Sequence, residues 1–382
     1  MRPESETELA EAVRSANGPL RLQGGGTRPI GNPVSGEVLE LSGLSGITLY
    51  EPGALTMVAQ AGTSLAEVQA ALAAEGQRLA FEPMDHRGLL GTTGEPTIGG
   101  VVAANISGPR RVQVGACRDF LLGVRFVDGS GTVIKNGGRV MKNVTGYDLV
   151  KLLCGSYGTL GALSEVSFKV LPKVEVAGCL KLAGLTVAEA VAALSRALGS
   201  PYEVSGAAHA PAGPDGEAVT LIRLEGFADS VAYRGGKLRE SLTGFGDTEL
   251  DLDTGRVEAL WRWVGDVEAF HLGQGDVWRI SVKPSDGSEV VSRLPDAGIV
   301  MDWGGGLIWA EVAAGTDIRA KLRGVPGHAT LIRADDEMRT KLGAFQPEAA
   351  PLAKISAGLR AKFDPRGILN PGLMAPVEGV SA

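Results

Sequence analysis

The chain has 382 residues, of which 44% are hydrophobic and 21% are charged, and its formal net charge is −7. This balance is ordinary for a soluble protein of two or three domains. Because the basic residues are scattered, we expect neither a nucleic acid nor an anionic membrane surface as a partner. No apolar run of about 18 residues occurs and the start has no signal-like apolar core, so we expect no transmembrane segment and a cytoplasmic protein, at most peripheral to the inner membrane through its partners.

Cysteine and histidine are few and widely separated. Cys117, Cys154 and Cys179 form no Cys-x-x-Cys pair, which argues against a disulfide framework and an iron–sulfur or zinc site, so we expect buried thiols. The four histidines are also far apart, so the sequence predicts no metal site and no histidine-based triad.

Short strands and helices are expected to alternate through roughly the first 170 residues. Ser5 is predicted to cap a helix that ends at Asn17-Gly18, and Ser64 caps a second helix that ends at Gly76. A hairpin is expected where Asp128-Gly129-Ser130-Gly131 separates two short apolar runs. The predicted strands are 20–23, 38–41, 57–61, 123–127, 132–135 and 162–171.

A second pattern, expected to form an α+β region with an antiparallel sheet, begins after Pro172. Thr186 and Glu189 form a capping box at the start of a helix that runs to Leu198. The other predicted helices are 231–242, 257–267, 288–294 and 349–363, and the predicted strands are 179–182, 218–226, 277–282, 298–303, 307–312 and 328–333. We therefore expect three regions, residues 1–172, 173–345 and 346–382.

Segments rich in glycine and other small residues are the most informative feature of the first region. They are residues 24–28, 97–108, 142–149 and 155–161. Small side chains allow main-chain N–H groups to reach a phosphate or a ring edge directly. In the first segment the Thr27 hydroxyl and the Arg28 guanidinium add what a pyrophosphate requires. The alternatives are a flexible turn at 24–28 and close helix-to-sheet packing at 97–108.

Other nucleotide-binding and hydrolase motifs are missing from the sequence. It contains no G-x-G-x-x-G, no G-K-[ST] P-loop, no G-x-S-x-G and no H-E-x-x-H. A nicotinamide cofactor is therefore disfavoured.

The order of these segments resembles the FAD-binding domain of the vanillyl-alcohol oxidase or PCMH-type superfamily. Within it, KNVTGYDLVKLLCGSYGTLG and FDPRGILNPG resemble the smaller FAD-binding subunits, or E subunits, of glycolate oxidase complexes. The resemblance covers nearly the whole chain and is strongest over 20–172 and 360–372. It implies an α+β fold, with a PCMH-type FAD-binding domain of two α+β subdomains and an α+β cap domain that holds an antiparallel sheet.

The resemblance also implies roles for particular residues. The pyrophosphate of FAD would be held by Gly24, Gly25, Gly26, Thr27 and Arg28. The ribityl chain and the flavin ring would be lined by Pro83, Thr97, Gly99, Gly100, Ala103, Ser107 and Gly108. The adenine and ribose would meet Gly158, Thr159, Gly161 and Leu163.

Two departures from the superfamily bear on the expected chemistry. The glycine loop has no His or Cys to tether the flavin, so we expect noncovalent FAD. The chain also lacks the H-x-x-x-G-D-G-N-x-H motif that the 2-hydroxy-acid dehydrogenases of the superfamily use. It offers Arg223, Arg279 and Arg333 as cations for a carboxylate and Tyr147 or Asp148 as polar groups, but the sequence assigns no catalytic residue.

The resemblance implies a flavoprotein subunit that supports oxidation of glycolate to glyoxylate in a complex. The expected partners are a larger FAD-containing subunit and an iron–sulfur subunit, with a small 2-hydroxy acid as a candidate substrate. The alternatives are a self-sufficient FAD-dependent dehydrogenase for a hydroxy acid or alcohol, and a noncatalytic assembly scaffold that keeps the flavin fold.

Overall fold

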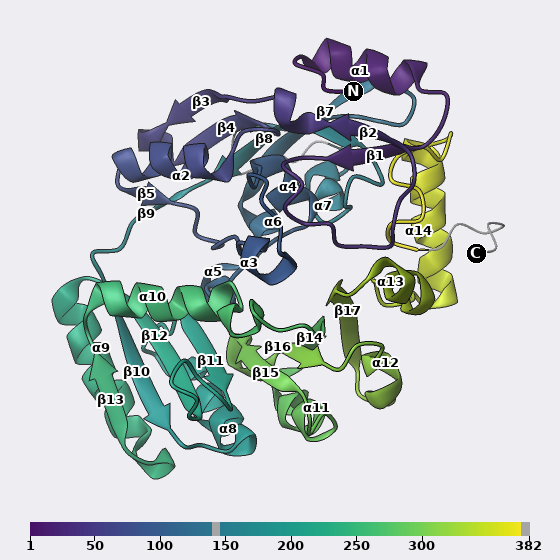
Figure 1. The fold of residues 1–382 in the computed structure, drawn as a ribbon. Coiled ribbons are helices and arrows are strands. Elements are labelled where there is room, and N and C mark those ends of the chain that lie inside the picture. Colours follow the sequence, from purple (N-terminus) through teal and green to yellow (C-terminus); the bar gives the residue numbers. More distant parts are fainter. Residues whose placement is uncertain (140–145, 376–382) are drawn as a thin grey trace.

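The computed structural model describes residues 1–139 and 146–375 and divides them into two lobes. Figure 1 shows a first lobe, built mainly from the amino-terminal part of the chain, above a second lobe that contains a large sheet. Residues 142–145, part of one glycine-rich segment, lie outside the described residues.

The first lobe holds a five-stranded antiparallel sheet in the order β3-β4-β8-β6-β7 and a parallel pair β1-β2. The short antiparallel pair β5-β9 closes the lobe. Its strands are β1 (Leu20–Gln23), β2 (Glu37–Glu40), β3 (Ile47–Glu51), β4 (Thr56–Gln60), β5 (Gln77–Arg78), β6 (Leu121–Val127), β7 (Val133–Gly137), β8 (Ala162–Lys169) and β9 (Leu171–Pro172).

The helices of the first lobe are mostly short. They are α1 (Glu6–Ser15), α2 (Leu65–Ala74), α3 (Arg87–Leu90), α4 (Ile98–Ala103), α5 (Arg111–Val114), α6 (Cys117–Phe120) and α7 (Leu149–Leu153). The Ser5 and Ser64 hydroxyls accept hydrogen bonds from the N–H groups of Glu8 and Glu67, which confirms both predicted N-caps. The β6-β7 hairpin is confirmed as well.

The second lobe is an eight-stranded antiparallel sheet in the order β13-β10-β12-β11-β15-β16-β14-β17. Its strands are β10 (Val176–Ala183), β11 (Gly206–Ala210), β12 (Val219–Gly226), β13 (Thr248–Asp251), β14 (Asp276–Val282), β15 (Gly298–Asp302), β16 (Leu307–Val312) and β17 (Gly327–Arg333). Its helices are α8 (Val187–Leu198), α9 (Ala228–Ser241), α10 (Thr254–Gly265), α11 (Gly287–Ser292), α12 (Ile318–Lys321) and α13 (Asp336–Leu342).

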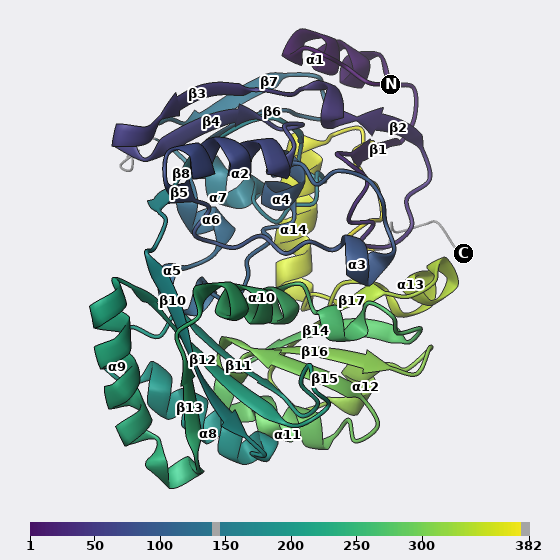
Figure 2. The ribbon, with the colours of Figure 1, turned by 60° about the vertical axis from the view of Figure 1, so that its left-hand side comes forward.

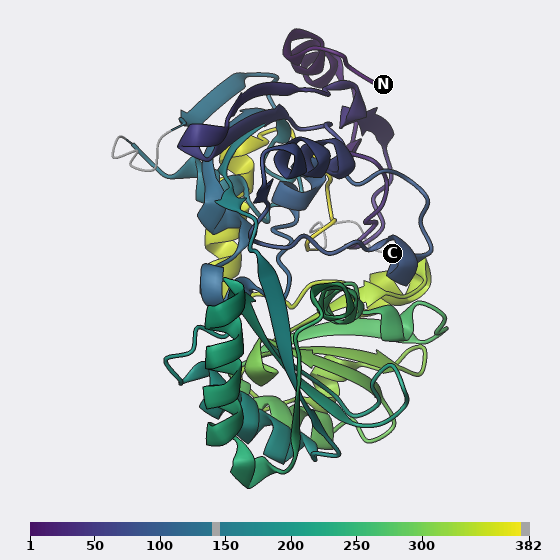
Figure 3. The same ribbon diagram turned by 90° about the vertical axis from the view of Figure 1, so that its left-hand side faces the viewer.

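Side-chain alternation gives this sheet two different faces. Leu180 on β10 and Trp278 on β14 point to the face that helices α8, α9, α11 and α12 cover. Their neighbours Cys179 and Val277 point to the opposite face, which packs against α10 and the first lobe. Figures 2 and 3 show α10 between the sheet and the first lobe.

The C-terminal part of the chain returns to the first lobe. Helix α14 (Ala350–Phe363) packs there through Phe363, whose ring centroid lies 6.1 Å from that of Phe126. Leu369 then forms a parallel bridge with Leu20, beside β1. The segment around Leu369 thus lies beside β1 and the glycine-rich loop that follows it. The domain limits at residues 172 and 345 stay a prediction.

Four strands were not predicted from the sequence, namely β3, β5, β11 and β13. All five β11 residues are buried and four of them are Gly or Ala, so the strand shows no alternation of polar and apolar residues. Helix-to-sheet packing was one of the two alternatives for the segment 97–108, and part of that segment forms helix α4.

Candidate functional site

A cavity of about 390 Å³ lies in the first lobe, between the loop after β1, helix α4 and the C-terminal segment. Twelve of the sixteen residues that the resemblance implied for FAD line it: Gly24, Gly25, Gly26, Thr27, Arg28, Thr97, Gly99, Gly100, Ala103, Gly158, Gly161 and Leu163. Three glycine-rich segments that are far apart in the sequence therefore share one cavity, and the binding roles of these residues stay predictions.

The other four residues do not line the cavity. Gly108 lies where the lobes meet, because its carbonyl accepts a hydrogen bond from Trp303 Nε1 at 3.1 Å. The Ser107 hydroxyl accepts from the N–H of Cys117, and the Thr159 hydroxyl donates to the Ser156 carbonyl at 2.7 Å. Pro83 is half-buried beside Met84.

The glycine loop packs backbone to backbone against residues 94–97. A Cβ on Gly25 would lie 1.6 Å from the Glu95 carbonyl oxygen, and one on Gly94 would lie 1.7 Å from the Gly25 carbonyl oxygen. A Cβ on Gly24 would lie 2.5 Å from Thr97 Oγ1. The loop is thus closely packed and also lines the cavity, and its contact with a phosphate stays a prediction.

This packing changes what Gly25→Val is expected to do. From the sequence alone, we expect the variant to fold normally and to lose FAD because its side chain blocks the phosphates. The structure places the new Cβ against the Glu95 backbone, so we now expect a loss of roughly 1–3 kcal/mol in the free energy of unfolding as well. Urea denaturation without FAD checks this, and a variant as stable as the parent would contradict it.

Helix α4 is held against β4 by its small residues. The Thr97 hydroxyl caps the helix by accepting from the Gly100 N–H at 3.2 Å. A Cβ on Gly99 would lie 2.6 Å from both the Cβ and the carbonyl oxygen of Ala61. Glycine at 99 therefore permits the close helix-to-strand contact that puts Ala103 on the cavity wall.

Arg28 is the distinctive charged group of the cavity. Its Nε and Nη1 atoms are buried and have no hydrogen-bond partner among residues 1–139 and 146–375. Burial lowers the pKa of Arg28 to about 10, so the side chain is still a cation at neutral pH. A buried guanidinium without an acceptor is costly unless an anion completes it.

Several cavity residues were missed by the sequence analysis. Asn370, from the C-terminal segment, accepts from the Leu22 N–H and donates to the Tyr157 carbonyl, both at 2.8 Å. Tyr157 and Asn370 line the cavity and have positive φ angles of 52° and 45°. The Asn-Pro-Gly ending was the available signal, but only folding shows that it reaches the cavity.

Two of the histidines, His86 and His209, are buried and offer little proton-transfer chemistry. Burial, with the nearby Arg28 cation, lowers the pKa of His86 to about 3, and burial lowers that of His209 to about 4. Both side chains are therefore neutral at physiological pH. In the part of the chain that the structure describes, no group of three His, Cys, Asp or Glu side chains could hold a metal ion.

The three cap arginines differ in their contacts. Arg333 pairs with Glu311 at 2.6 Å and also donates to backbone carbonyls, and Arg223 pairs with Glu82 at 2.8 Å. Only the guanidinium of Arg279 has no hydrogen bond or ion pair with a described residue. Of the other two candidates, Tyr147 is 90% exposed and Asp148 caps helix α7.

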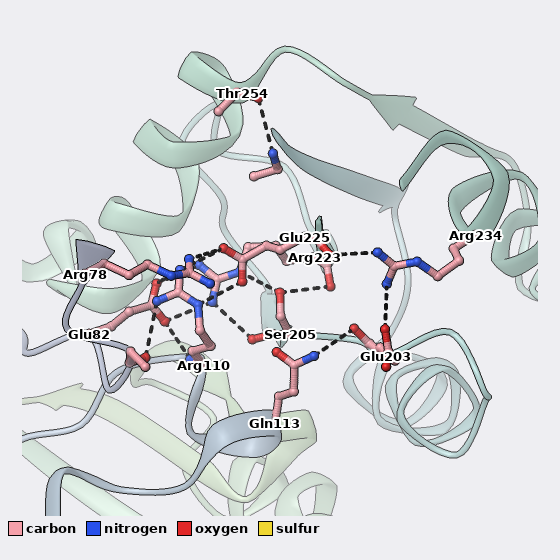
Figure 4. A network of polar contacts seen from close by, with 12 residues as sticks. Arg78, Glu82, Arg110, Gln113, Glu203, Ser205, Arg223, Glu225, Arg234 and Thr254 are labelled. Atoms are coloured by element: carbon pink, nitrogen blue, oxygen red, sulfur yellow. Dashed lines mark hydrogen bonds and ion pairs between the residues drawn. The ribbon is translucent and has the colours of Figure 1, made fainter. Parts of the chain in front are cut away.

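A buried ion network joins the two lobes (Figure 4). Glu225 of the second lobe accepts from Arg78 and Arg110 of the first lobe, each at 2.8 Å. Glu82 of the first lobe accepts in turn from Arg223 of the second. Burial opposes the charge on Glu225, but Arg223, Arg110 and Arg78 hold its pKa well below its ordinary value.

Comparison with known proteins agrees with this arrangement. Residues 1–137 match the family of FAD binding domains. The chain is 36% identical over 359 residues to glycolate oxidase subunit GlcE of Escherichia coli, covering 93% of this chain and 92% of that protein. The chain belongs to the GlcE family.

Two further comparisons concern this GlcE family member. It is 27% identical to glycolate oxidase subunit GlcD of Bacillus subtilis, with 93% of this chain and 83% of that protein covered. An alkyldihydroxyacetonephosphate synthase structure matches with a TM-score of 0.68 at 15% identity, over 97% of this chain and 76% of the other. This likeness shows a shared fold. The match to the FAD binding domain, together with that fold, confirms the predicted PCMH-type architecture, and the same match confirms the predicted cofactor.

Proposed function

We propose that this chain is the FAD-binding subunit of a glycolate oxidase complex that converts glycolate to glyoxylate. Its similarity to GlcE over nearly the whole chain, and to GlcD, supports this assignment. The structural observation that carries it is Arg28, a cation in a cavity walled by glycine backbone, with two buried nitrogens that have no partner among the residues the structure describes.

The residues of the cavity fit FAD. Arg28 would meet a phosphate with charged hydrogen bonds, and the backbone N–H groups of residues 24–27 would add neutral ones. Ala103 and Gly100 leave room beside helix α4 for a flat ring. Bound FAD would supply the group that accepts and passes on electrons. We propose noncovalent binding, because no His or Cys lies in the loop 24–28.

The proposed partners are a larger FAD-containing subunit and an iron–sulfur subunit. The E. coli and B. subtilis relatives, each called a glycolate oxidase subunit, support a multi-subunit assembly. No helix of the described residues has the length and apolar character that a membrane crossing requires. A cytoplasmic location stays a prediction.

The purified chain is expected to be yellow, with equimolar FAD released on denaturation, and to oxidise glycolate only negligibly by itself. The missing histidine motif is the reason for the second expectation. The visible spectrum, flavin quantitation and a dye-coupled glycolate assay measure both. A colourless protein with no affinity for added FAD would favour the scaffold alternative, and robust turnover by the chain alone would favour the self-sufficient dehydrogenase.

A further inference from the structure

Two arginines from different lobes meet at one tryptophan. Arg111 lies on α5 of the first lobe and Arg279 on β14 of the second. Their guanidinium carbons lie 4.5 and 5.1 Å from the ring centroid of Trp303. Stacking on an aromatic ring orients a guanidinium while its N–H groups stay available to a ligand.

Neither guanidinium has a hydrogen bond or an ion pair with any residue in the described ranges 1–139 and 146–375. The neighbouring arginines of the interface, Arg110 and Arg223, are instead engaged by Glu82 and Glu225. Arg111, Arg279 and Trp303 are each half-buried, so solvent still reaches part of every one of these side chains. Among the described residues, the interface thus supplies carboxylates to Arg110 and Arg223 but not to Arg111 and Arg279.

The surroundings do not neutralise these two cations. Burial lowers the pKa of Arg279 to about 10, and Arg111 contributes to the lowering. Burial raises the pKa of the adjacent Asp302 to about 7, so this carboxyl is only partly ionised near neutral pH. Asp302 Oδ1 accepts from the Trp303 N–H at 2.7 Å rather than from either guanidinium. A net positive charge therefore remains beside Trp303.

The backbone at this place is held in uncommon conformations. Trp303 has a φ of 54°, and Tyr157, which packs against the same buried cluster as Trp303, has a φ of 52°. Large aromatic residues rarely adopt positive φ, and such residues gather at functional sites. Trp303 Nε1 donates a hydrogen bond to the Gly108 carbonyl, which links the Trp303 ring of the second lobe to the first lobe. Tyr157 also connects this place to the cavity, since it forms part of the cavity wall.

We propose that Arg111, Arg279 and Trp303 form a binding site for the carboxylate of a small 2-hydroxy or 2-oxo acid, next to the Tyr157 wall of the cavity. The planar guanidinium fork matches the two oxygens of a carboxylate. A ligand held by Arg111 and Arg279 contacts both lobes at once. The choice of acid rests on the proposed function, whereas the anion site itself rests on two arginines that have no acidic partner in the part of the chain that the structure describes.

The test is a glycolate titration of the purified chain by calorimetry and by tryptophan fluorescence, with FAD content measured on the same samples. Arg279→Met and Arg111→Met should each weaken glycolate binding roughly tenfold to hundredfold, because each removes charged hydrogen bonds. Arg279→Lys should recover only part of the affinity. Glycolamide, the neutral analogue, should bind at least roughly tenfold more weakly than glycolate.

Arg262→Met is the matched control, since Arg262 is an exposed arginine of α10 in the same lobe. It should leave the glycolate affinity unchanged. Equal affinity of the parent and Arg279→Met, or of glycolate and glycolamide, would overturn the site. A chain that holds FAD but binds no glycolate would overturn the site and leave the proposed function standing. Glycolate binding that depends on Arg279 in a chain unable to hold FAD would support the site and contradict the proposed function.

Discussion

Replacing Glu225 with glutamine is expected to lower the free energy of unfolding by about 3–5 kcal/mol, the range for breaking a buried ion pair. The Glu225 side chain is 6% exposed, so solvent screens its charge little. It accepts from Arg78 at 2.8 Å and from Arg110 through both Nε and Nη2 at 2.8 Å. Without this carboxylate, three arginines share only Glu82, and the lobe interface holds uncompensated positive charge.

Urea denaturation followed by circular dichroism measures the effect of Glu225→Gln. The matched control is Glu240→Gln, which removes the partner of Lys237 at 2.9 Å on the surface of α9. That pair is well exposed, so we expect a change below about 0.5 kcal/mol. Equal effects of the two substitutions would mean that the network contributes nothing to holding the lobes together.

Arg28→Met is expected to weaken FAD binding roughly 10- to 150-fold, which corresponds to the loss of one charged hydrogen bond. The same substitution should leave the FAD-free chain as stable as the parent or more stable, because the buried Nε and Nη1 of Arg28 have no partner to lose among the described residues. The two effects have opposite signs, which separates a ligand-binding arginine from a structural one.

The measurements are a titration of the FAD-free chain with FAD and a urea denaturation of the same sample. Arg262→Met is again the control, since its side chain is exposed and the substitution should change neither quantity. A clear loss of stability in the FAD-free Arg28→Met chain, with unchanged FAD affinity, would refute the role given to Arg28.

Much of the fold follows from local signals in the sequence. The caps at Ser5, Ser64 and Thr186 were confirmed because a hydroxyl and the backbone N–H three residues later are close in any helix start. Strand β11 escaped prediction because Gly206, Ala207 and Ala208 are small and buried on both faces, so only the neighbouring strands reveal it.

Some residues of the candidate site could likewise be predicted from the sequence, and others could not. The glycine-rich segments and Arg28 were found because the residue types themselves indicate backbone contact with an anion. The approach of Asn370 to the cavity was not predicted, because it depends on a contact between Asn370 and Leu22, which are 348 positions apart. Pro83, Ser107, Gly108 and Thr159 were assigned by resemblance, and the structure places them off the cavity wall.

The sequence by itself determined the α+β class, the order of the glycine-rich segments and the absence of a G-x-G-x-x-G motif, because helix caps, alternation and turn chemistry act over a few residues. Only the tertiary structure decided which arginines have a carboxylate partner among the described residues. Arg223 and Arg279 looked alike in the sequence, yet Arg223 meets Glu82 across 141 residues of chain and Arg279 stacks on Trp303. The reason is that the partner of a charged side chain depends on which face of the sheet meets the other lobe, and packing over long distances along the chain sets that face.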